Sequence, residues 1–126
     1  MRLRSERGTA ALEFALVLPL LLVLVLSVVQ AGLVVRDELI LVGAARAAAR
    51  EAAVTGDDQL VRDAVDRSAP GLDAGSIDLS VTRGGRGNSA SVSLSYGESL
   101  RVPFVAWLFP STITLRAGAV MRQEFG

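Results

Sequence analysis

An acidic residue stands at the start of a long apolar run, and no other residue of this chain has so plain a need for a charged partner. Residues 14–35, which follow Glu13, contain no charged side chain. An ionised carboxylate inside hydrocarbon costs on the order of a few kcal/mol unless it is paired or reaches the surface. Two interpretations stay open: Glu13 lies among lipid headgroups, or it pairs with a positive group at the same depth.

A cut between Gly8 and Thr9 would create such a positive group. It would remove residues 1–8 and leave the amino group of Thr9 at the start of a helix. Glu13 would then lie four residues along, one helical turn away. Within one subunit the two charges could pair, and between staggered subunits they could set the register of an assembly.

The composition argues against most enzyme chemistry. All thirteen cationic residues are arginine, and the chain has no lysine, histidine or cysteine. A Ser-His or Cys-His nucleophile, a Schiff base and an ordinary zinc site therefore cannot be built. The neighbouring acids Asp37-Glu38 and Asp57-Asp58 are typical of solvated or helix-capping residues. We expect no catalysis, no cofactor, no metal and, at a formal net charge of zero, no nucleic-acid partner.

The element that positions Glu13 is an apolar helix. Residues 14–35 would form a helix ~33 Å long, enough to cross the hydrocarbon core of a bilayer. Arg2, Arg4 and Arg7 precede it, which predicts a cytoplasmic amino terminus and an extracytoplasmic remainder. Pro19 removes one backbone hydrogen bond, so a kink or a melted turn is expected there.

The leader has the pattern of a known family. Gly8, the four residues 9–12 and then Glu13-Phe14 resemble the processing motif of type IV pilin-like proteins. With the alanine-rich residues 44–53 and the terminal residues 119–124, the chain resembles the TadE-like minor pilins, or pseudopilins, of tight-adherence type IV pili. The sister TadF type is similar in these motifs, so the choice between the two stays open.

This resemblance implies a function and partners. A prepilin peptidase would cut at the processing site, Gly8 and Thr9, while Glu13 and Phe14 would serve recognition and assembly. The other implied partners are the major pilin, sister minor pilins and the inner-membrane assembly platform. The protein would be a single-pass protein of the cell membrane, in contact with lipid, and an expected component of a surface pilus.

Two other functions are compatible with the same residues. The chain could be an uncleaved, single-pass interaction protein. It could also be a small secreted domain released after Ala31, because Val29-Gln30-Ala31 is a passable signal-peptidase site. The length of the apolar run and the presence of Glu13 favour the pilin-like interpretation.

The remaining residues predict a small α+β domain. Apolar and alanine residues at three- and four-residue spacing continue the helix over residues 36–55, giving one helix from about Ala10 to Val54 that ends at Thr55-Gly56. Asp57 or Asp58 is expected to cap a short second helix, which Pro70-Gly71 ends. Its predicted apolar stripe is Leu60, Val61, Ala64 and Val65.

Alternating patterns then predict three antiparallel strands, at residues 77–82, 90–96 and 112–124. A glycine-rich hairpin loop lies over residues 83–88, and residues 100–109 form an aromatic plug over the sheet or a docking patch. The sheet is expected to pack on the helix at residues 36–54. The result is a pilin-like lollipop with a leader at 1–8, a transmembrane and assembly helix at 9–35, its continuation at 36–55 and a domain at 56–126.

Overall fold

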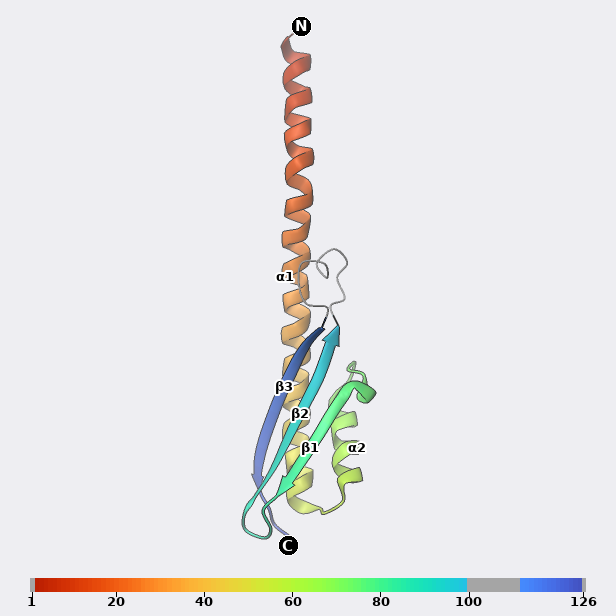
Figure 1. The fold of residues 1–126 in the computed structure, drawn as a ribbon, viewed down its shortest axis with the longest axis vertical. Helices are drawn as coiled ribbons and strands as arrows, with labels where there is room; N and C mark the ends of the chain where they lie inside the picture. Colours follow the sequence, from red (N-terminus) through yellow and green to blue (C-terminus); the bar gives the residue numbers. More distant parts are fainter. Residues whose placement is uncertain (1, 100–111, 126) are drawn as a thin grey trace.

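A long helix with a small domain around its carboxyl-terminal half forms the whole molecule (Figure 1). The computed structural model describes residues 2–99 and 112–125, with side chains from residue 8 onward. In chain order the elements are α1 (Arg2–Val54), α2 (Asp58–Ser68), the short 3-10 helix η1 (Ala74–Ser76), β1 (Ile77–Arg83), β2 (Ser89–Ser99) and β3 (Thr112–Arg122). The predicted α+β class and its elements are therefore confirmed.

Helix α1 is longer than the sequence predicted. It has 53 residues and hence a length of about 80 Å. It begins at Arg2 rather than near Ala10, so the leader backbone is helical too, because nothing before Gly8 breaks a helix. The helix continues through Pro19, so the alternative of a melted turn is wrong, and the kink stays a prediction. The predicted end before Thr55-Gly56 is confirmed.

Helix α2 turns back alongside α1 and is capped as expected. The Asp57 carboxylate accepts a hydrogen bond from the backbone N–H of Gln59 at 2.8 Å, which satisfies a donor at the helix start. Val61, Ala64 and Val65 are buried against the rest of the domain. Leu60, placed in the same stripe by the sequence, is instead 44% exposed.

The three strands form an antiparallel sheet in the order β1-β2-β3. One rung aligns Leu79, Leu94 and Ala117, which face α1, and the alternate residues face away from it. The loop between β1 and β2 is a hairpin loop, as predicted. Gly85 and Gly87 adopt φ values of 86° and 81°, which side chains rarely allow.

The core lies between the sheet, α2 and the last turns of α1, as predicted. Small residues on α1 let the sheet approach the helix closely, and larger ones from the strands fill the space. The fully enclosed or nearly enclosed members include Leu41, Ala44, Ala45, Ala48, Ala49, Ala52, Val61, Val65, Val92, Leu94 and Tyr96.

The segment after β3 closes the lower end of the domain. Strand β3 ends at Arg122 rather than Glu124, because the next residues bond elsewhere. The Gln123 backbone N–H donates to Asn88 O at 2.7 Å, and the Glu124 N–H donates to Ala53 O at 2.8 Å. These bonds join the hairpin loop, the segment after β3 and α1. The aromatic segment 100–109 predicted to cover the sheet lies outside the described residues.

Candidate membrane and assembly segment

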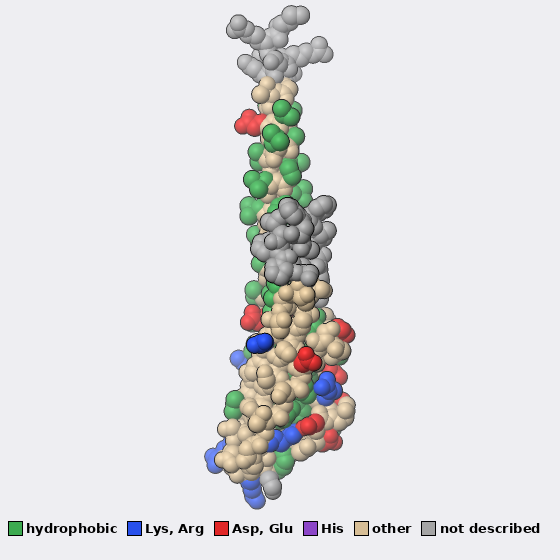
Figure 2. All heavy atoms as spheres, in the orientation of Figure 1, with side chains coloured by type: hydrophobic (Ala, Val, Ile, Leu, Met, Phe, Trp, Pro, Cys, Tyr) green, Lys and Arg blue, Asp and Glu red, His purple; other side chains and the backbone are tan. Residues whose placement is uncertain are grey.

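The amino-terminal half of α1, from residue 8 to residue 29, carries its apolar side chains outward. We call this part of the helix the shaft. Gly8–Val54 is a helix long and apolar enough to cross a membrane, and its most apolar 18-residue window is 0% buried. Figure 2 shows apolar side chains along the upper shaft. The large exposed ones are Leu12, Phe14, Leu16, Val17, Leu18, Leu20, Leu21, Leu22, Leu24, Val25, Val28 and Val29. Water would oppose such exposure, whereas a bilayer accommodates it.

Polar residues mark the place where the shaft meets the domain. Gln30 is the first buried residue of α1 from residue 8 onward, at 5% exposure. Arg36 Nη1 then lies 3.1 Å from Asp37 Oδ1, with the Asp37 side chain enclosed and that of Arg36 half exposed. The interpretation of Asp37 as a solvated acid is therefore wrong. Position 37 lies on the helix face that continues through Leu41 and Ala44 into the core, which the spacing would have indicated.

Glu98 is a second buried acid, and it was not among the residues expected to be functional or buried. It is fully enclosed on the inner face of β2. The signal was the period-two pattern itself, because Val92, Leu94 and Tyr96 place residue 98 on the same face. Acidic residues are mostly exposed in proteins, so the residue type alone gave the opposite indication.

Glu13 is exposed on the apolar half of α1, and the structure leaves both interpretations of it open. Figure 2 shows an acidic side chain among the apolar ones of the upper shaft. Within the described part of the chain, Glu13 makes no hydrogen bond or ion pair. Its neighbour Phe14 is 65% exposed. A charge and an aromatic ring are thus both presented to whatever surrounds the helix.

Gly8 and Thr9 lie within the same continuous helix. A side chain added at Gly8 would meet no atom within 4 Å, so the Cα of Gly8 faces open space. Helical geometry places Thr9 and Glu13 on one face, one turn apart. Glycine also weakens a helix by about 1 kcal/mol relative to alanine, which favours local unwinding at this bond.

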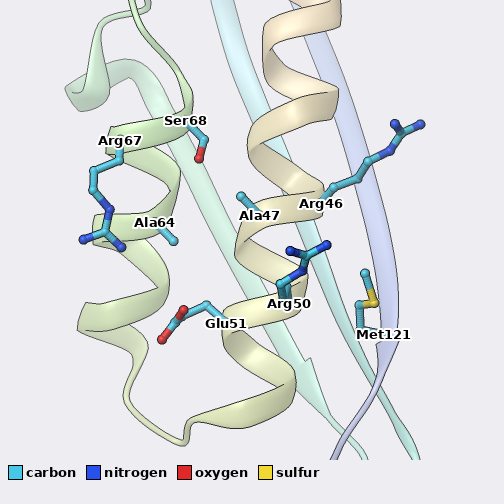
Figure 3. Close-up of a pocket in the computed structure, with 8 residues that line it drawn as sticks. All are labelled: Arg46, Ala47, Arg50, Glu51, Ala64, Arg67, Ser68 and Met121. Atoms are coloured by element: carbon cyan, nitrogen blue, oxygen red, sulfur yellow. The ribbon is translucent and has the colours of Figure 1, made fainter.

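A groove at the opposite end of α1 was not foreseen. It has a volume of about 440 Å³ and lies along α1 beside α2 (Figure 3). Its lining comprises Arg46, Ala47, Arg50, Glu51, Ala64, Arg67, Ser68 and Met121. Among the described residues, no group of three or more acidic residues is placed to hold a metal ion. Three arginines and one acid among the lining residues make the groove a basic surface.

Together, these features define a class of protein: a small α+β domain on one long helix whose exposed apolar half fits a membrane anchor. Residues 8–50, about a third of the chain, match the family model described as TadE-like protein, which confirms the resemblance over this segment. The match associates the chain with tight-adherence pili in general terms. No curated protein and no solved structure matches the chain.

Proposed function

We propose that this protein is a TadE-like minor pilin, or pseudopilin, which is cut between Gly8 and Thr9 and takes part in assembly of a tight-adherence type IV pilus. The observation that carries the proposal is the bare apolar shaft of α1 with Glu13 near its start. The TadE-like match over residues 8–50 covers this shaft and supports it. The arginines of the leader favour insertion with the amino terminus in the cytoplasm.

Cleavage would change the electrostatics of the shaft. The new Thr9 ammonium would stand one helical turn from the Glu13 carboxylate. In the low dielectric of a membrane or a helix bundle, opposite charges attract far more strongly than in water. The pair would form within one subunit or between staggered neighbours, and the exposed face of α1 would pack against other apolar helices.

The proposal names partners and a role for the domain. A prepilin peptidase would cut the leader, and the assembly platform would bring the shaft together with the major pilin and sister minor pilins. The domain around residues 36–125 would stay outside the membrane to prime, cap or adapt the filament. Cleavage and helix packing would thus take place at one end of α1, and the role of the domain in the filament would be carried out at the other end.

The competing functions differ in the mature amino terminus. An uncut anchored protein would keep Met1, whereas release by signal peptidase would leave Gly32. A cut after Ala31 is disfavoured, because α1 is continuous there and the cut would remove Gln30, which is buried. Mass spectrometry of the amino-terminal peptide, isolated from the native host, tests the proposal. A peptide starting at Thr9 is expected, and intact Met1 throughout would refute processing.

A further inference from the structure

One face of α1 stays uncovered where the helix passes through the domain. Leu39, Gly43, Arg46, Arg50 and Val54 are all exposed and recur at three- and four-residue spacing, opposite the buried face. A side chain added at Gly43 would meet no atom within 4 Å, so this face is open. We call these five residues the α1 stripe.

The cations along this face have no partner among the residues that the structure describes. In the described residues, the ion pairs are Arg36 with Asp37 and Arg83 with Asp58. Arg46, Arg50 and Arg67 line the groove and make no hydrogen bond or ion pair with any described residue. Figure 3 shows Arg46 extending from α1 on the side away from α2, toward β3. This side of the molecule therefore offers two guanidinium groups, one turn apart, to an outside acceptor.

The outer face of α2 carries two acids, flanked on the helix by the exposed Arg62 and Arg67. On α2, Gln59, Asp63 and Asp66 lie on the face opposite the buried Val61, Ala64 and Val65. We call these three residues the α2 ridge. Asp63 accepts from Gln59 Nε2 at 3.1 Å, which holds its carboxylate on the ridge, and Asp66 is exposed. The two acids are three residues apart and are near neighbours on the helix surface.

The stripe and the ridge lie at the same height along the molecule. Ala64, Arg67 and Ser68 of α2 line the same groove as Arg46 to Glu51 of α1, and α2 runs back beside α1 (Figures 1 and 3). Residues 63–66 of α2 therefore lie at about the level of residues 46–51 of α1, and the antiparallel course of the two helices brings Gln59 near the level of Val54. Copies anchored by the same helix in one membrane would keep these levels matched.

We propose that the α1 stripe of one copy binds the α2 ridge of a second copy, with Arg46 and Arg50 receiving Asp66 and Asp63. The surfaces differ, so the contact is head-to-tail and leaves a free stripe and a free ridge at the ends of each pair. It can therefore extend beyond a dimer. The contact does not require cleavage after Gly8, so its failure and the failure of processing are separate results.

Disulfide crosslinking of the full chain tests this contact, because the chain has no cysteine of its own. One tagged copy carries Val54→Cys and a differently tagged copy carries Gln59→Cys, and the two are mixed in lipid vesicles and oxidised. We expect a crosslinked pair. Ser80→Cys, on the outer face of the sheet, replaces Gln59→Cys as the control and is expected to give only background. Equal yields from both mixtures would overturn the proposal.

Charge reversal then tests the chemistry. Arg46→Glu with Arg50→Glu in the Val54→Cys copy, or Asp63→Arg with Asp66→Arg in the Gln59→Cys copy, is expected to lower the crosslink yield by about tenfold. Mixing the two reversed copies restores attraction at both surfaces, so the yield is expected to recover. Failure to recover would overturn the pairing.

Arg116→Glu with Arg122→Glu is the matched control, because it makes the same charge change on exposed residues of β3. Its yield is expected to equal that of the unmodified pair. A loss as large as that of the stripe variant would show a nonspecific charge effect. If the stripe variant still crosslinks normally but no longer binds another pilus protein, the stripe is the binding surface for that protein, and the proposed contact between copies is wrong.

Discussion

At the scale of single residues, Gly8 and Glu13 have separate roles in the proposal. Gly8 lies in a helix with open space around it, so what it contributes is small size and easy unwinding. Glu13 contributes a charge in a place where charge is costly. The sequence identifies both residues, because a glycine followed five residues later by an acid at the start of an apolar run is unusual. Sequence could not reveal that the bond after Gly8 is helical, because that depends on how far the helix extends before it.

Gly8→Leu is expected to leave an uncut precursor in the membrane. A bulky side chain would obstruct a peptidase site shaped for glycine, and leucine would also strengthen the helix around the bond by about 1 kcal/mol. Amino-terminal mass and gel mobility in the native host measure the result. Gly8→Ala restores a small side chain and is the control. Normal cutting of the leucine variant would disprove the assigned site.

Glu13→Leu is expected to insert into the membrane at least as well as the original chain, because it removes a charge from hydrocarbon. It is expected to be cut normally and to fail in assembly, because the Thr9 amine then has no carboxylate one turn away. Membrane fractionation and the amount of surface pili measure the two steps. Glu13→Asp keeps the charge and is expected to keep part of the assembly. Normal pili with leucine at this position would contradict the pairing.

At the scale of elements, the buried faces of the helix and the strands could be predicted from the spacing of apolar residues. The polar residues on those faces could not. Alternation in β2 and alanine spacing in α1 identified the faces that meet in the core. Asp37 and Glu98 were missed because their position in the pattern conflicts with their residue type. The groove was missed because it needs residues from α1 and α2, whose relative placement no local pattern contains.

Leu41→Ala is expected to destabilise the domain by about 2–5 kcal/mol, because Leu41 is fully enclosed between α1 and the sheet. Leu39→Ala makes the same chemical change two residues away, where the side chain is 68% exposed. It is expected to change stability by less than about 0.5 kcal/mol. Thermal unfolding of the full chain in micelles, followed by circular dichroism, compares the two. Equal losses would place the core elsewhere.

At the scale of the whole molecule, one uninterrupted helix joins the shaft to the domain. The direction in which the domain faces is therefore fixed relative to Thr9 and Glu13. The sequence predicted one helix, but its extent through the leader and through Pro19 came from the structure.

Inserting two alanines after Val25, where the shaft is exposed, would turn the domain by about 200° relative to Glu13. Inserting seven would turn it by about 700°, which nearly restores its direction. We expect both variants to fold and to be cut, the first to lose pilus assembly and the second to recover part of it. Counts of surface pili measure this. Equal assembly by both would mean that the two halves act independently.

The continuity of α1 also has a mechanical consequence. A load applied along the shaft would pass through its backbone hydrogen bonds to the domain, because no loop lies between them. Pro19 has no backbone N–H, so the helix turn before it has one hydrogen bond fewer and resists extension least. Under tension the shaft would stretch there first and spare the domain, so that a subunit could yield slightly and recover without unfolding.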